Sequence, residues 1–157
     1  VSQIPKHMHL RTEMQLLQPN DLDKLDSLIS VFETVFEMKD FRRPGMAHLQ
    51  ALLKKETFFA VVALTEGKII AGLTVYVLDQ YYSEKPLAYL YDLAVLPQYQ
   101  RRGVGRSLIA FTTEHCREKG FEEFFVQADV PDQHALDFYR STKPTNEEEV
   151  IHFYYTL

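Results

Sequence analysis

The sequence has 157 residues, a formal net charge of −5 and a single cysteine, Cys116. This length fits one domain over residues 1–157, one cysteine excludes a disulfide framework or a cysteine-rich zinc site, and the acidic balance argues against a nucleic-acid partner. No apolar run approaches the roughly 18 residues that span a membrane, and the first residues lack the basic-then-apolar order of a secretory signal, so we expect a cytoplasmic protein.

The first half of the chain predicts strands at both ends of a helical region. Apolar and polar residues alternate from Met8 to Leu16, which indicates a strand. A helix follows over residues 18–36, capped by Asn20 or Asp21 and apolar along one face, and a second, short helix covers residues 46–55. The runs TFFAVVAL and KIIAGLTVYVL are separated by TEGK, which predicts a β-hairpin.

The second half alternates strands and helices. LAYLYDLAVL is a strand ended by Pro97, residues 106–120 form a helix that stops at Gly120, and FEEFFVQADV, QHALDFYRS and EVIHFYYTL read as strand, helix and closing strand. Sequential hairpins with two late crossovers predict an α+β (mixed α/β) fold. Its mostly antiparallel mixed sheet has about six to seven strands and is flanked by four helices.

Charge is segregated along this second half. Residues 96–121 hold five Arg or Lys against two Glu, a net of +3, whereas residues 122–157 hold eight acids against two bases, a net of −6. Such segregation is either an ordinary solvated surface or a pair of neighbouring sites, one for an anion and one for a cation.

The stretch YQRRGVGRSL places two glycines and three arginines between a strand and a helix. Leu108 stands where a dinucleotide fingerprint has its third glycine, and Gln100 and Arg106 depart from the Walker A pattern. Glycines let consecutive backbone N–H groups face one point, and the following helix adds unpaired amides and its positive dipole end, an arrangement that suits a pyrophosphate. The alternative is an ordinary helix start with solubilising arginines.

The segment LYDLAVLPQYQRRGVGRSLI resembles the acetyl-coenzyme A binding segment of the GNAT superfamily of N-acetyltransferases, whose fold has the same order of elements. YLYDLAV, FVQAD and EEEVIHF are similar to the aminoglycoside 3-N-acetyltransferases within it. The resemblance implies an acyltransferase that moves the acetyl group of acetyl-CoA to the 3-amino group of an aminoglycoside, by direct transfer in a ternary complex and without a metal. It also implies a homodimer, with VIHFYYTL either at the interface or internal.

The same resemblance assigns the acetyl-CoA site. Backbone amides would hold the pyrophosphate, the strand edge at Leu93 and Val95 would pair with the pantetheine arm, and an N–H near Val95 would stabilise the oxyanion. The remaining residues assigned to acetyl-CoA follow that strand: Gln100, Arg101, Arg102, Gly103, Val104, Gly105 and Arg106.

Two residues are candidates for the chemistry. Asp92 would accept a proton from the attacking amine or orient its ammonium form, unless it only bonds to backbone. Tyr139, a phenol of pKa about 10, would protonate the departing thiolate, unless it only packs beside Phe138. After Tyr139 the chain reads RSTKPTNEEE, which departs from the family pattern.

The cationic substrate would be steered and held by carboxylates, with a solvated surface as the alternative interpretation: Asp92, Asp129, Asp132, Glu148 and Glu149. A polyamine, another small cationic amine or a basic peptide would suit the same field, so these stay alternative substrates. A non-catalytic CoA-binding sensor is a further alternative, against which the intact glycine motif, Asp92 and Tyr139 speak.

Overall fold

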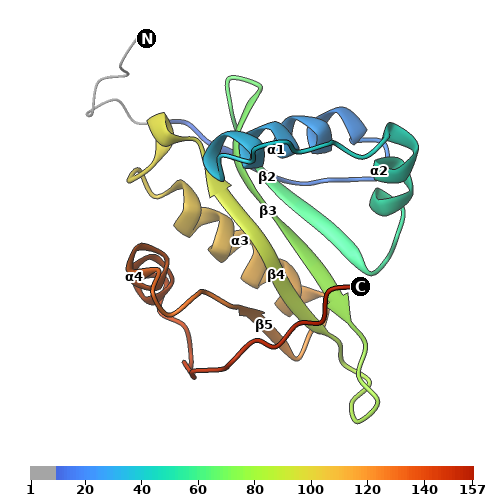
Figure 1. The fold of residues 1–157 in the computed structure, drawn as a ribbon, viewed down its shortest axis with the longest axis vertical. Helices are drawn as coiled ribbons and strands as arrows, with labels where there is room; N and C mark the ends of the chain where they lie inside the picture. Colours follow the sequence, from blue (N-terminus) through green and yellow to red (C-terminus); the bar gives the residue numbers. More distant parts are fainter. Residues whose placement is uncertain (1–9) are drawn as a thin grey trace. The chain divides into compact units, whose positions relative to one another are not determined.

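The computed structural model describes residues 10–157, whose strands form one sheet in the order β1-β2-β3-β4-β5 (Figure 1). The first three pairings are antiparallel, and only β4 and β5 are parallel. The expected mixed α+β fold is therefore confirmed, with five strands in the described part of the chain rather than six or seven. Their bounds are β1 (Glu13–Leu16), β2 (Phe58–Thr65), β3 (Lys68–Leu78), β4 (Leu87–Val95) and β5 (Glu123–Val126).

Two strand ends differ from the sequence prediction. β1 begins at Glu13, and Met8, the predicted start, lies outside the described residues. β5 ends at Val126, four residues before the predicted end at Val130, and pairs with β4 only as far as Leu90. The four residues that follow, QADV, include Ala and Asp, which are depleted in strands. The TEGK hairpin is confirmed: Thr65 pairs with Lys68, and Glu66 and Gly67 take the positive φ angles of 50° and 74° that suit a two-residue turn.

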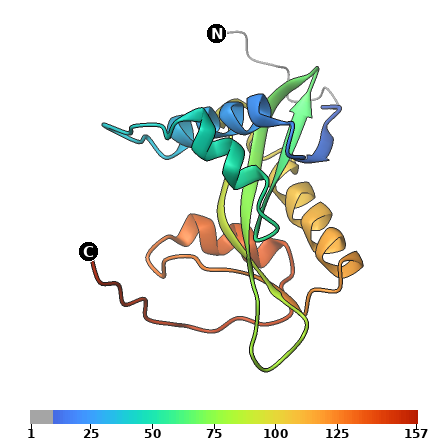
Figure 2. The same cartoon turned by 90° about the vertical axis from the view of Figure 1, so that its right-hand side faces the viewer.

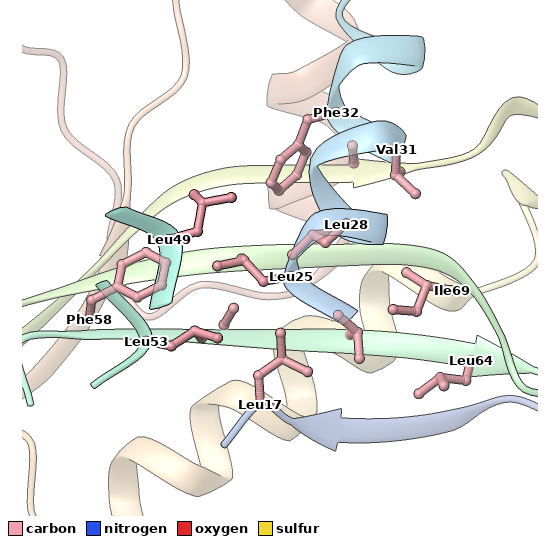
Figure 3. Close-up of a cluster of buried hydrophobic side chains, with 13 residues drawn as sticks. Leu17, Leu25, Leu28, Val31, Phe32, Leu49, Leu53, Phe58, Leu64 and Ile69 are labelled. Atoms are coloured by element: carbon pink, nitrogen blue, oxygen red, sulfur yellow. The ribbon is translucent and has the colours of Figure 1, made fainter. Parts of the chain in front are cut away.

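Helices cover both faces of the sheet. α1 (Leu22–Val35) and α2 (Met46–Leu53) lie on one face, and α3 (Val104–Glu118) lies on the other (Figure 2). The core cluster between the first two helices and the sheet includes Leu25, Leu28 and Phe58 (Figure 3), whereas Leu108 and Cys116 of α3 pack against the opposite face. Alternating strand residues thus bury both faces of β2, as its apolar run predicts.

α1 packs unusually close to the sheet at Gly72 of β3. A Cβ atom at this position would lie 2.5 Å from Cδ1 of Leu28 and 2.7 Å from the carbonyl oxygen of Val61. A residue without a side chain is therefore required for the helix to contact the strand here.

The chain divides into two units, one ending at Val126 and one running from Gln127 to Leu157. In the second unit α4 (Gln133–Ser141) forms where QHALDFYRS predicts it, and Arg140 forms a two-pronged ion pair with Glu147, at 3.0 Å for Nε–Oε2 and 2.5 Å for Nη2–Oε1. The turn after the helix, where the sequence departs from the family pattern, is therefore closed by its own ion pair.

The predicted closing strand is wrong: residues 149–157 have no helix or strand. β-rich sequence forms a strand only against another strand's backbone, and no described strand pairs with this segment. Its apolar side chains are all more than half exposed: Val150, Ile151, Phe153, Tyr154, Tyr155 and Leu157. Within residues 10–157, no helix has both the length and the apolar character to cross a membrane.

Candidate active site

A β-bulge on β4 sets the position of the first candidate residue. Thr74 of β3 pairs with Asp92 and Val75 pairs with Leu90, so Tyr91 is one extra residue on β4. A bulge bends a strand and turns its side chains relative to the regular ladder. Asp92 therefore follows directly after a local distortion of the sheet.

Asp92 carries a half-buried carboxyl group without a counterion. Its partner Thr74 pairs with Ala60, a core residue under α1 and α2, so Asp92 lies on that face of the sheet. Among residues 10–157 no hydrogen bond or ion pair engages its carboxylate, and burial raises the pKa of Asp92. A carboxylate of raised pKa is a stronger proton acceptor and attracts a cation more strongly than an exposed one.

Beyond the bulge, β4 exposes a backbone edge that β5 does not cover. β5 pairs only with Leu87–Leu90. The amide of Leu96 donates to Ile70 of β3 at 2.9 Å, and because successive residues of a strand direct their backbone groups to opposite edges, Leu93 and Val95 point away from β3. This edge can accept an extended ligand arm, as the sequence predicts for pantetheine.

The side chain of Gln100 ties the next loop to this edge, since its Nε2 donates to the carbonyl oxygen of Val95 at 2.9 Å. Gln100 therefore supports β4, and its predicted direct contact with acetyl-CoA stays a prediction. A short 3₁₀ turn over Pro97–Tyr99 lies between the two and ends the strand where Pro97 predicts it.

The N-terminus of α3 offers unpaired amides. Gly103 is its N-cap with φ +81°, a left-handed conformation that favours glycine, and no side chain caps the helix. The first intrahelical bond runs from Ser107 N–H to the carbonyl of Gly103. The amides of Val104, Gly105 and Arg106 therefore have no intrahelical acceptor, and they lie at the positive end of the helix dipole.

Arginines surround this helix end. Arg101 and Arg106 are exposed and Arg102 is half-buried. A hollow of about 300 Å³ opens beside the glycine loop, lined by Leu10, Thr12, Met14, Arg102, Gly103, Val104 and Ser107. Backbone donors, dipole and cations together make an anion site of the kind that suits a pyrophosphate.

The remaining predicted site residues belong to the second unit. Tyr139 lies half-buried on α4, with its ring 4.9 Å from that of Phe138. Asp132 caps α4 by accepting a hydrogen bond from the amide of Ala135 at 3.0 Å, which gives it a structural task. Asp129, Glu148 and Glu149 are exposed. The catalytic and substrate-binding roles of these residues stay predictions.

Sequence reasoning missed a row of aromatic side chains across the sheet. Register pairs Phe58 with Tyr76, Tyr76 with Tyr89, and Tyr89 with Phe125; these four residues are the aromatic row. Tyr91, on the bulge, contacts both Tyr76 and Tyr89, with ring centroids 5.5 and 5.9 Å apart. The four strands were predicted, but only their relative register brings these rings together, and the bulge that shifts it has no signal in the sequence.

Histidine and cysteine contribute packing. His115 of α3 lies edge-on to Phe59 with ring centroids 5.2 Å apart, and burial lowers its pKa. Burial raises the pKa of Cys116 to about 11, which keeps this thiol protonated and unreactive at neutral pH. No cluster of metal-ligating side chains occurs in the part of the chain that the structure describes.

The chain is similar to known acetyltransferases. Residues 23–142 match the acetyltransferase (GNAT) family. An aminoglycoside acetyltransferase, meta-AAC0020, from an uncultured soil metagenomic sample, is 60% identical over 93% of this chain and 96% of its own, with TM-scores of 0.92 for its complex with sisomicin and 0.91 for that with trehalose. Another soil metagenomic aminoglycoside acetyltransferase, HMB0005, is 32% identical over 94% of this chain and 99% of its own, with a TM-score of 0.87. No curated protein sequence matches.

Proposed function

The chain belongs to the acetyltransferase (GNAT) family, and we propose that it transfers the acetyl group of acetyl-CoA to the 3-amino group of an aminoglycoside. The observation that carries this proposal is the 60% identity, over nearly the whole chain, to an acetyltransferase whose structure contains sisomicin. The 3-amino position rests on the sequence resemblance alone.

The acetyl-CoA site that we propose uses the features of the first unit. The uncapped amides of Val104, Gly105 and Arg106 fit a pyrophosphate because they are unpaired donors at a helix N-terminus. The outward edge at Leu93 and Val95 fits the pantetheine arm, and a backbone N–H near Val95 stabilises the negative charge that develops on the thioester oxygen. Acetyl-CoA supplies an activated acyl group.

The transfer itself needs a free amine and a good leaving group. The amine nitrogen forms a bond to the carbonyl carbon while the carbon–sulfur bond breaks. We propose that Asp92, directly or through water, accepts the proton that the amine loses, which its raised pKa favours. Tyr139 donates the proton that converts the departing thiolate to a thiol.

An aminoglycoside carries several ammonium groups, so carboxylates without counterions favour its binding. Asp92 meets this description in the first unit. In the second unit we propose exposed Asp129, Glu148 and Glu149 as further cation contacts. Asp132 would contact the cation in addition to capping the N-terminus of α4. Glu147 is excluded as a cation contact because its carboxylate already forms an ion pair with Arg140.

We also propose a homodimer in which the exposed apolar segment 150–157 is covered. A cytoplasmic location stays a prediction, as does a single domain that unites the two units.

Thiol release with purified protein, acetyl-CoA and gentamicin, spermidine or a basic peptide tests the function. Turnover with gentamicin, followed by NMR of the product to locate the acetylated nitrogen, is the expected result. Acetylation at another nitrogen would contradict the 3-amino position alone.

The other outcomes of this assay are equally informative. Turnover with spermidine or the peptide but not with gentamicin would contradict an aminoglycoside substrate. The protein would then be an acetyltransferase that acts on another amine. Tight binding of acetyl-CoA without turnover of any amine would favour the sensor.

A further inference from the structure

The aromatic row and Tyr91 form a surface that core packing does not explain. The row starts in the core at buried Phe58, whose ring lies edge-on to Tyr76 at 5.4 Å, and ends at the stacked pair Tyr89–Phe125, with ring centroids 4.8 Å apart. Between these anchors, Tyr76 is 37% and Tyr91 59% exposed. Two rings on adjacent strands are therefore flanked by aromatic neighbours and are still open to solvent.

Asp92 lies beside these two rings. It follows Tyr91 on β4, and its carboxylate acts on the phenols of Tyr76 and Tyr89: burial contributes most to raising their pKa, followed by Tyr91 and then by Asp92. Both phenols therefore stay protonated and uncharged at physiological pH, and they can donate hydrogen bonds. The carboxylate of Asp92 has no counterion among the described residues. Two partly exposed aromatic rings, set at 86° to each other, thus border one unpaired negative charge.

The chemistry of this surface selects one class of ligand. Any ammonium group can bind the carboxylate, but only a ring-bearing amine also presents a broad C–H face that buries apolar area against an aromatic ring. The centroids of the two rings are 5.5 Å apart and their planes meet at 86°, so a ligand ring that packs against the face of one tyrosine also meets the second tyrosine beside it. Tyrosine hydroxyls at its edge match the hydroxyls of a saccharide.

We propose that Tyr76 and Tyr91 are a platform on which an amino-sugar ring of the substrate lies, with its ammonium group directed to Asp92. The inference rests on the proposed function and extends it, because it makes these tyrosines the residues that distinguish a ring-bearing amine from a linear one. Tyr91 holds this position because the bulge places an extra residue on the face that carries Asp92.

The test compares ring-bearing and linear amines on single variants. Saturation-transfer NMR titrations, which report affinities into the millimolar range, are run with gentamicin, glucosamine and spermidine in the presence of saturating coenzyme A. Tyr91→Ala and Tyr76→Ala are expected to weaken the binding of gentamicin and of glucosamine about fivefold to tenfold each, the effect of losing roughly 50 Å² of apolar contact with the sugar ring. The saturation-transfer signal of the sugar-ring protons is expected to disappear. Spermidine affinity is expected to stay within about twofold of wild type.

Tyr91→Phe is the matched control, since it keeps the ring and removes only the hydroxyl. It is expected to retain most of the affinity for both ring amines. Thermal midpoints of all three variants check that the sheet is intact, and an intact sheet is expected because both replaced side chains are partly exposed.

The inference and the proposed function fail in different ways. The platform is overturned and the function stands if wild type turns over gentamicin but the alanine variants bind gentamicin as tightly as wild type does. The same conclusion follows if the alanine variants lose as much affinity for spermidine as for gentamicin. If wild type turns over no aminoglycoside but binds glucosamine through Tyr91 and Tyr76, the platform stands without the aminoglycoside. If wild type binds neither ring amine, both are overturned.

Discussion

Asp92 combines a functional advantage with a cost in stability. Its half-buried carboxylate has no partner among residues 10–157, and burial raises its pKa. Because the pKa is higher in the folded than in the unfolded chain, the protonated form favours folding. That contribution is present at acidic pH and is lost as pH rises through the folded pKa. At neutral pH the ionised side chain therefore destabilises the fold that positions it.

Asp92→Asn should separate these two effects. Turnover is expected to fall by about 10²–10⁴-fold, the range for losing a general base, while the Kd for acetyl-CoA stays unchanged. The thermal midpoint at pH 7 is expected to exceed that of wild type, because asparagine carries no charge to desolvate. This difference should shrink toward pH 4, where an unfolded aspartate becomes protonated at its ordinary pKa of about 3.9.

Asp79→Asn is the matched control, an exposed aspartate on the loop before β4. It is expected to leave both turnover and the thermal midpoint at pH 7 unchanged. Full activity of Asp92→Asn would show that Asp92 has only a structural role. An unchanged thermal midpoint at pH 7 would contradict the inference that burying the ionised carboxylate destabilises the fold.

At the scale of elements, α3 and the loop before it were the best-defined part of the sequence. The two glycines predict a backbone that turns amides toward one point, and Gly103 does so as a left-handed N-cap. The detail that the sequence missed is Gln100, which bonds to Val95. A glutamine in a predicted phosphate loop gives no sign of whether it contacts ligand or backbone.

Gly103→Ala tests whether this conformation matters for the ligand. A side chain at φ +81° strains the backbone by about 1–2 kcal/mol, so stability falls and the first-turn amides shift. The KM for acetyl-CoA is expected to rise several-fold, with the KM for the amine little changed, as measured by steady-state thiol release.

Gly120→Ala provides the comparison at the opposite end of the same helix. Gly120 also has a left-handed φ, +78°, and a Cβ atom added there, as at Gly103, would meet no neighbouring atom within 4 Å. A similar loss of stability in urea unfolding is expected, without any effect on the KM for acetyl-CoA. Equal KM changes in both variants would mean that general destabilisation, not the loop, is responsible.

At the scale of the whole molecule, periodicity predicted the elements better than it predicted their pairing. The helices and strands of residues 22–95 follow their apolar patterns closely, because each buries one face or both against the same sheet. The aromatic row depends on register across four strands, which local sequence does not encode. The closing strand failed for a related reason, since a β-rich segment carries no information on which strand it pairs with.

The exposed segment 150–157 is the strongest indication that one chain is not the complete assembly. Six large apolar residues in eight positions are more than half exposed, and the valine, isoleucine, phenylalanine and leucine among them would each contribute about 1.5–3 kcal/mol if fully buried. A run of β-branched and aromatic residues without a partner strand is suited to pairing with a second copy. We therefore expect a homodimer that depends on this segment.

Deletion of residues 150–157 should convert that dimer to a monomer. Light scattering coupled to size-exclusion chromatography is expected to give twice the chain mass of 18.3 kDa for the full chain and about one chain mass for the deletion. The double variant Phe153→Asp, Tyr155→Asp keeps the length of the segment and is expected to be monomeric too, because two charges cannot be buried in an apolar interface without a large desolvation cost. Replacement of Glu148 by Gln, next to the segment, should leave the dimer intact. A full-length monomer would contradict the homodimer, and a deletion variant that stays dimeric would place the interface elsewhere on the chain.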